Sequence, residues 1–244
     1  MSNKSPKILG ILGGMGPFAS AEFLKTIYEY NLPLKSEQDT PKVLLYSDPS
    51  FPDRTTTFLQ GNDVILQQRL IDALSKLVDL EVTKITICCI TSHYFLLNLP
   101  VQLTHKIISL VDVIINAVLA NPQPYLLLCT QGTIKMQIFQ RHPLWNQAKE
   151  YILLANSQDQ QLIHNMIYQI KQQGKITPVK EIIANLQSTY QVNHFIAGCT
   201  EIHLLSKSWN LKNANSSDDC NYFLDPLTLI AQNLNQYLDD RIAR

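Results

Sequence analysis

The chain has 244 residues, of which 45% are hydrophobic and 16% are charged, and its 20 basic and 20 acidic side chains cancel. This composition excludes intrinsic disorder, and the absence of net charge argues against binding to nucleic acid or to an anionic membrane. No apolar run approaches the ~18 residues of a membrane-spanning helix, and the first residues lack a clear signal-peptide pattern, so we expect a cytoplasmic protein.

Short apolar runs alternate along the chain with amphipathic segments. Runs that are apolar on both faces are typical of buried parallel strands, and we expect such strands at 7–12, 42–47, 84–89, 125–130, 150–155 and 194–198. Apolar residues that recur every three or four positions predict helices at 17–30, 63–79, 111–120, 159–173 and 179–190. This alternation predicts an α/β fold with parallel sheets flanked by helices.

Two features occur once in each half of the chain. A strand followed by a glycine turn occurs in KILGILGGMG and again in YLLLCTQGT, and a strand that ends in cysteine and threonine occurs at 85–91 and at 195–200. We therefore predict two α/β lobes of related plan, the first formed by 1–105 plus 212–244 and the second by 106–211. A single doubly wound domain with chance similarity is the alternative.

The first glycine turn has two interpretations. Gly14, Gly16 and Ala19 fit the G-x-G-x-x-[G/A] pattern of dinucleotide-binding folds, but no acidic residue ends the second expected strand at the required distance. Backbone N–H groups at the start of a helix also bind anions. We therefore predict an anion-binding turn rather than a nucleotide site.

The five cysteines lie at irregular spacings, which favours reduced thiols over a disulfide framework, and no pair has the spacing of a zinc site. Cys89 and Cys199 each end an expected strand, at the sheet edge where ligands bind in α/β proteins. If the lobes face each other, two thiols on opposite sides of one carbon can remove a proton from one face and deliver another to the opposite face. A small buried hydrophobe is the alternative interpretation of either cysteine alone.

Six motifs follow one another along nearly the whole chain: ILGGMGPFASAEF, DPSFPDRT, ICCITSHYF, LLLCTQGTI, FIAGCTEIHLL and LDPLTLIA. Their order resembles the aspartate/glutamate racemase family, and aspartate racemases most closely. The resemblance implies two pseudo-symmetric lobes with the active site in the cleft between them. It also implies racemisation of a small amino acid by two cysteines, with neither pyridoxal phosphate nor metal as cofactor, and a homodimer.

The resemblance assigns roles to residues that match the family's motifs. Cys89 and Cys199 match the catalytic acid and base, and Arg54 would bind the side-chain carboxylate of the substrate through its planar guanidinium. His93 is expected to cap or pack near the site rather than to take the substrate proton, and Glu201 to orient a neighbour or to favour its helix. The predicted substrate-binding residues are Met15, Arg54, Ile90, Thr91, Thr133, Lys171 and Thr200.

Three departures from the family pattern concern the substrate. Ile90 stands in place of an asparagine, and Asp48 adds a negative charge that disfavours an acidic substrate unless it is paired or points away. Lys171 is one residue out of step with the family's K-x-G helix end. The sequence therefore indicates the type of reaction more directly than the substrate.

We predict a cofactor-independent racemase of aspartate or glutamate. Ile90 and Asp48 suggest a first alternative, a relative that acts on another amino acid, a hydantoin or a maleate-like diacid. The second alternative is a non-catalytic protein that binds a small carboxylate.

Overall fold

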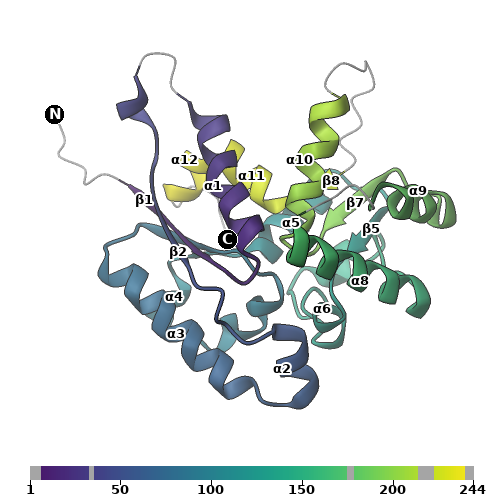
Figure 1. Cartoon of the computed structure of the whole chain (residues 1–244), viewed down its shortest axis with the longest axis horizontal. Coiled ribbons are helices and arrows are strands. Elements are labelled where there is room, and N and C mark those ends of the chain that lie inside the picture. Colours follow the sequence, from purple (N-terminus) through teal and green to yellow (C-terminus); the bar gives the residue numbers. More distant parts are fainter. Residues whose placement is uncertain (1–6, 33–35, 175–178, 214–222, 240–244) are drawn as a thin grey trace.

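Two parallel four-stranded sheets form the framework of the chain (Figure 1), in a computed structural model that describes residues 7–32, 36–174, 179–213 and 223–239. The first sheet has the order β2-β1-β3-β4, with strands at Lys42–Ser47, Ile8–Gly13, Lys84–Ile87 and Ile107–Ile108. The second has the order β6-β5-β7-β8, with strands at Ile152–Leu153, Tyr125–Leu128, His194–Ala197 and Phe223–Leu224. The same strand order in both sheets confirms the predicted α/β fold with two lobes of related plan.

Helices flank both sheets. Those of the first half are α1 (Pro17–Asn31), η1 (Glu37–Asp39), α2 (Arg54–Gln60), α3 (Asp63–Asp79), η2 (Thr91–Asn98), α4 (Val101–Thr104) and α5 (Leu110–Ala120). The later ones are α6 (Gln131–Lys135), α7 (Trp145–Ala148), α8 (Ser157–Gln173), α9 (Val179–Tyr190), α10 (Ile202–Asn213), α11 (Pro226–Gln232) and α12 (Leu234–Leu238). All five expected helices form close to their predicted bounds, whereas the short helices and the two-residue strands β4 and β8 lack a periodic signal that a sequence could show.

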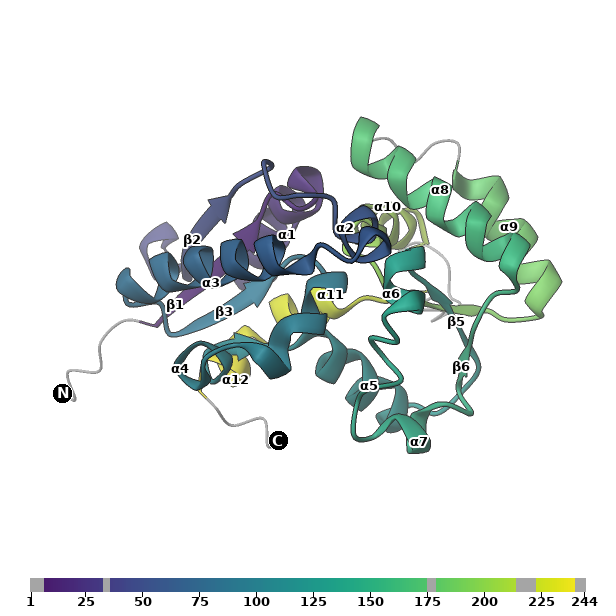
Figure 2. The ribbon, with the colours of Figure 1, turned by 90° about the horizontal axis from the view of Figure 1, so that it is seen from below.

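Two strands lie across the expected lobe boundaries. The first sheet includes β4, beyond the predicted end of that lobe segment at 105, because β4 pairs with β3. The second sheet includes β8, although 212–244 was expected to belong to the first lobe, because β8 pairs with β7. After β8 the chain does return toward the first lobe, where α11 packs on α1 (Figure 2). Apart from these two strands, the lobe bounds stay a prediction.

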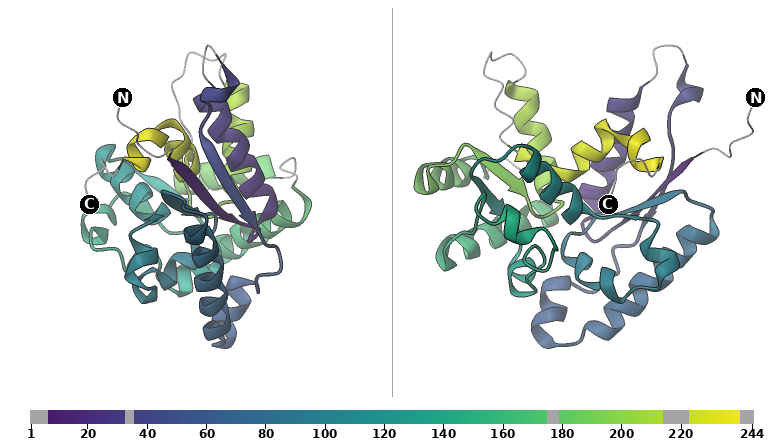
Figure 3. Two further views of the ribbon diagram at one scale, coloured as in Figure 1. Left: turned by 90° about the vertical axis from the view of Figure 1, so that its left-hand side faces the viewer. Right: turned by 180° about the vertical axis from the view of Figure 1, so that it is seen from behind.

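Three groups of buried apolar side chains hold the molecule together. One lies between α3 and the first sheet, around Leu12 and Ile85, and another lies between the second sheet and helices α8 and α9, around Leu126 and Leu128. The third, which we call the shared core, joins both lobes through residues of α1, α5, α11 and the inner faces of both sheets. In the right-hand view of Figure 3, the ribbons of α5 (teal) and α11 (yellow) lie between the two lobes. The lobes are thus fastened by a common apolar interior, which fixes the relative positions of their strand ends.

Polar side chains begin several of these helices. Asp53 accepts a hydrogen bond from the Thr56 N–H at the start of α2, and Asp225 accepts one from the Leu227 N–H at the start of α11. Such caps stabilise helix ends whose first N–H groups have no partner within the helix. Within the described ranges, no helix is both long and apolar enough to cross a bilayer.

Candidate active site

The two cysteines singled out by the sequence occupy equivalent places in the two sheets. Cys89 lies two residues after the end of β3 and Cys199 two residues after the end of β7, and these strands hold the same position in the two sheet orders. Both side chains are nearly buried, at 6% and 7% exposed. They also interact electrostatically, because a negative charge on Cys89 disfavours one on Cys199. The fold thus brings the two thiols into one region between the lobes.

A buried glutamate lies beside the second thiol. The Cys199 thiol donates a hydrogen bond to Oε2 of Glu201 over a distance of 2.8 Å, and the Thr200 hydroxyl reaches the same oxygen at 3.4 Å. Burial, followed by the negative charge of Glu201, raises the pKa of Cys199 well above its usual value, although the positive charge of Lys171 acts in the opposite direction. Cys199 is therefore a protonated thiol at neutral pH.

A buried arginine lies beside the first thiol. Burial alone would lower the pKa of Arg54, but its interactions with Cys89, Asp53 and Glu201 raise that pKa, so the guanidinium is charged. Its terminal nitrogens donate to backbone oxygens of Met15, at 2.5 Å, and Pro52, at 2.9 Å, with a longer contact of 3.5 Å to Phe51. These bonds hold the positive charge rigidly next to Cys89.

A second polar group lies where α2 of the first lobe meets α8 of the second. The Tyr168 hydroxyl donates to Asp53 at 2.7 Å, and the Lys171 ammonium lies 4.7 Å from the centre of the Tyr168 ring. Burial would raise the pKa of Asp53, but the Thr56 N–H, the Tyr168 hydroxyl and the charge of Lys171 lower it, so this carboxylate is ionised. Lys171 thus lies near the site despite its shifted position in the sequence.

Three threonine hydroxyls meet between the lobes. Thr91 of the first lobe lies 3.0 Å from the hydroxyl of Thr133 and 3.3 Å from that of Thr130, and the latter two are 3.2 Å apart. All three side chains are buried. A hydroxyl can turn to donate or accept, so this group can reorient its hydrogens toward an anion.

Two residues close to Cys89, Ile90 and His93, have structural roles rather than roles in proton transfer. His93 donates from Nδ1 to the Cys89 carbonyl oxygen and accepts at Nε2 from the Leu110 N–H, so its imidazole is neutral. Burial lowers its pKa to about 4, although the hydrogen bond to Cys89 acts in the opposite direction. The Ile90 side chain belongs to the shared core. His93 therefore positions the Cys89 loop, as expected, and Ile90 contributes packing, while a role for the Ile90 backbone stays a prediction.

The charge of Asp48 is compensated. Its side chain accepts hydrogen bonds from the backbone and hydroxyl of Ser50 and forms an ion pair with Arg69, with an Nη2–Oδ2 distance of 3.1 Å. The Ser50 hydrogen bonds, more than Arg69, lower the pKa of Asp48. Asp48 is thus paired, which is one of the two conditions under which its charge would not disfavour an acidic substrate.

The first glycine turn is partly filled by the protein itself. The Gly14 N–H donates to the Ser20 hydroxyl, and a side chain at Gly14 would collide with the backbone of Asp48. A Cβ at Gly16 would lie 1.9 Å from Oε1 of Glu201. The Glu201 carboxylate therefore lies against this turn, and anion binding by the backbone N–H groups of the turn stays a prediction.

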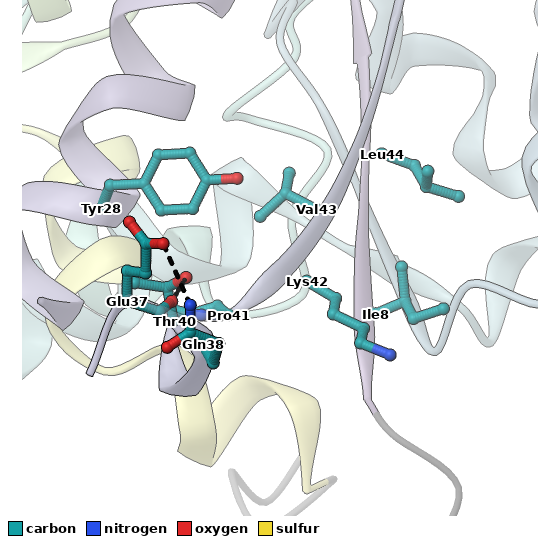
Figure 4. A pocket seen from close by; sticks show the side chains of 9 residues that line it. All are labelled: Ile8, Tyr28, Glu37, Gln38, Thr40, Pro41, Lys42, Val43 and Leu44. Atoms are coloured by element: carbon teal, nitrogen blue, oxygen red, sulfur yellow. Dashed lines mark hydrogen bonds between the residues drawn. The ribbon is translucent and has the colours of Figure 1, made fainter. Parts of the chain in front are cut away.

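A surface hollow of about 460 Å³ lies elsewhere, beside the edge strand β2 (Figure 4). Its lining includes Tyr28 of α1, Glu37 of η1 and Lys42 of β2, and it includes none of the predicted site residues. It is thus separate from the cysteines. In the described part of the chain, no group of three His, Cys, Asp or Glu side chains is arranged to hold a metal ion.

Sequence reasoning missed Asp53 and Tyr168 and gave Glu201 only an auxiliary role. Asp53 directly precedes Arg54, and Tyr168 lies one helical turn before Lys171. The contact between Asp53 and Tyr168, however, joins residues 115 positions apart. The position of Glu201 against Gly16 likewise depends on how the lobes meet. No local pattern could have revealed either contact.

Known proteins resemble this chain in sequence and in fold. The family model Asp/Glu/Hydantoin racemase matches residues 12–211. The broad specificity amino-acid racemase RacX of Bacillus subtilis (strain 168) is 23% identical over 210 residues, covering 80% of this chain and 86% of its own. Aspartate racemase of Picrophilus torridus superposes with a TM-score of 0.76 at 20% identity, covering 96% of this chain and 94% of its own. An aspartate racemase homologue from Pyrococcus horikoshii OT3 gives a TM-score of 0.65 at 17% identity, covering 96% and 99%.

Proposed function

Because this chain belongs to the Asp/Glu/Hydantoin racemase family of isomerases, we propose that it racemises an amino acid, with aspartate as the first candidate substrate. The observation that carries the proposal is the equivalent placement of Cys89 and Cys199 after β3 and β7. A racemase without an electron-sink cofactor needs an acid and a base on opposite faces of one carbon. Two thiols contributed by two related lobes satisfy that need.

The electrostatic surroundings support different resting states for the two thiols. The charged Arg54 guanidinium lies beside Cys89, whereas burial and the Glu201 carboxylate raise the pKa of Cys199 and favour its thiol form. In the proposed reaction, the Cys89 thiolate removes the α-proton, and the Cys199 thiol delivers its proton to the opposite face of the carbanion. The cysteines exchange protonation states with each turnover, and the reverse reaction starts from the other state.

The substrate carboxylates need positive charge or hydrogen-bond donors. The hydroxyl groups of Thr91 and Thr133 can donate to a carboxylate held between the lobes, together with backbone N–H groups around Ile90 and Thr200. The ammonium of Lys171 is the group we propose for the side-chain carboxylate of aspartate, because its charge acts on Cys199 and on Asp53. Met15 would shape the site, since its carbonyl oxygen fixes Arg54.

A broader amino-acid substrate range is the second candidate. Both terminal nitrogens of Arg54 already donate to carbonyl oxygens, so this side chain is a weaker candidate for gripping a carboxylate than the sequence alone suggests. A relative at 23% identity is named a broad specificity amino-acid racemase. Activity on neutral amino acids as well as aspartate would favour this candidate.

Two further proposals concern the cellular setting. The four cysteines in the described ranges are free thiols, as expected of a protein from a reducing compartment, and this supports a cytoplasmic location. The family resemblance supports a homodimer, which light scattering coupled to size-exclusion chromatography would test.

The decisive experiment is exchange of the α-proton for deuterium in heavy water, measured by NMR with a panel of amino acids. Replacing Cys89 or Cys199 by alanine should lower both exchange and racemisation by about a thousandfold, in the range expected for loss of an acid–base group. Cys129→Ala is the matched control, because Cys129 is also a buried free thiol but belongs to the shared core. Wild-type rates in either site variant would exclude the two-thiol mechanism, and no exchange with any amino acid would exclude the proposed activity.

A further inference from the structure

One oxygen of the buried Glu201 carboxylate has no hydrogen-bond partner. The side chain is only 2% exposed, and Oε2 accepts from Cys199 and Thr200, yet no donor within the described residues reaches Oε1. A carboxylate oxygen buried without a donor is strongly unfavourable, and buried polar groups in folded proteins nearly always have a partner. A bound ligand would supply the donor that the described residues lack.

The position of this oxygen limits where such a ligand lies. Oε1 approaches Gly16 so closely that a Cβ there would be 1.9 Å away, so the carboxylate extends from the second lobe to the first glycine turn. Its other oxygen is 2.8 Å from the Cys199 sulfur. A group bonded to the carbon that receives a proton from Cys199 is therefore within reach of Glu201.

A carboxylate in this position selects a cation that carries hydrogen-bond donors. An α-ammonium group has a positive charge and three N–H donors next to the stereocentre. A 2-hydroxy acid has a neutral hydroxyl there, and a hydantoin has a neutral ring N–H. A maleate-like diacid has neither an ammonium group nor another donor at that position. We infer that Glu201 binds the α-ammonium group of the substrate and so restricts the enzyme to α-amino acids. This inference rests on the proposed racemase function and adds a residue that selects the substrate class.

The same contact would assist the chemistry. An adjacent carboxylate keeps the ammonium group protonated, and a cationic nitrogen withdraws electron density from Cα, which makes the Cα–H bond more acidic. The proton balance stays simple: Cys89 takes the Cα proton, Cys199 gives its proton to Cα, and the ammonium keeps all three of its own. Glu201 accepts no proton in this sequence.

Isothermal titration calorimetry with matched ligands tests the inference. Racemic aspartate and racemic malate differ only in the ammonium and hydroxyl groups, and racemic ligands remove any effect of turnover on the titration. The wild-type protein should bind aspartate at least about tenfold more tightly than malate, the usual range for a hydrogen bond between charged groups. Glu201→Gln should reduce aspartate affinity by about tenfold or more and leave malate affinity equal or higher.

Glu22→Gln serves as the matched control. Glu22 is a carboxylate of α1 that pairs with Lys207 rather than with Cys199 or Gly16, so its loss should not change the ratio of the two affinities. Equal binding of aspartate and malate by the wild-type protein would overturn the inference even if Glu201→Gln failed to fold. An equal loss for both ligands in a folded Glu201→Gln protein would also overturn it. Racemisation without ligand discrimination would refute only the Glu201 assignment, whereas discrimination without racemisation would refute only the proposed function.

Discussion

Replacing Gly16 by alanine is the sharpest test of how the two lobes meet. The added Cβ would lie 1.9 Å from Oε1 and 2.9 Å from the carboxyl carbon of Glu201, far inside ordinary contact. The backbone at Gly16 has a φ of 167°, which is extended and open to any residue. The clash with Glu201 is therefore the main effect of this substitution.

The magnitude follows from overpacking of a buried site. Inserting a methyl group into a filled interior costs about 1–3 kcal/mol, which for a chain of this size lowers Tm by roughly 2–4 °C per kcal/mol. Either the carboxylate moves away from Cys199 or the turn before α1 moves away from the second lobe. In both cases the hydrogen bond from the Cys199 thiol to Glu201 is weakened.

A double-mutant cycle, measured by equilibrium denaturation, separates the clash from other effects of alanine. In a Glu201→Ala background the obstacle is gone, so Gly16→Ala should cost less than about 0.5 kcal/mol, and the two sites should be coupled by at least about 0.5 kcal/mol. In a Glu201→Gln background the bulk remains and the charge is removed, so the cost should persist. An equal cost of Gly16→Ala in all three backgrounds would refute the packing described here.

Three other substitutions test separate parts of the structure. Burial lowers the pKa of His93 from 6.5 to about 4, so on acidification the imidazole takes up a proton in the unfolded chain before it does so in the folded protein. Between pH 6.5 and about 4, each pH unit of acidification should therefore destabilise the protein by up to about 1.4 kcal/mol. Denaturation of His93→Gln should show a weaker pH dependence over this range. Asp225→Ala should lower the free energy of unfolding by about 3–5 kcal/mol, because it removes the carboxylate that lies 2.6 Å from both Nδ1 of the buried His203 and the buried Ser206 hydroxyl. A loss below about 1 kcal/mol would contradict this. Thr133→Val keeps the shape of the side chain but removes one of the three clustered hydroxyls. We expect kcat/KM for racemisation to fall about tenfold, while the free energy of unfolding changes by only about 1 kcal/mol. Unchanged kinetics would argue against a role of Thr133 in substrate binding.

The framework of the fold could be predicted because its signals are local. Each long strand is a short apolar run, and the five expected helices are amphipathic segments, and both patterns depend only on neighbours along the chain. The helix α10 (Ile202–Asn213) was not among the expected ones. The helix expected at 63–79 forms with those bounds, at Asp63–Asp79. The strands β4 and β8 were not predicted, because each has only two residues and forms by pairing with β3 or β7. The strand β6 is equally short, but it lies within the apolar run at 150–155.

The candidate site could likewise be predicted only where its signal is local in the sequence. Cys89 and Cys199 stood out because each follows a strand in a repeated plan, and that plan is visible in the sequence. Their unequal surroundings were not visible, because the charges that distinguish them come from residues brought together by folding. The substrate-binding role of Arg54 stays a prediction, whereas the hydrogen bonds from its terminal nitrogens to backbone oxygens, including that of Met15, 39 residues away, were not visible in the sequence.

The amino-acid sequence by itself determined the α/β class, the two related halves and the pair of cysteines, since periodicity and motif order need no knowledge of distant contacts. Only the tertiary structure decided that Glu201 lies against Gly16 with one oxygen unpartnered and that Tyr168 reaches Asp53 across the lobes. Those contacts lie where the shared core packs the two lobes against each other. They could not be predicted from local patterns, because electrostatic interactions depend on distance in space rather than on separation along the chain.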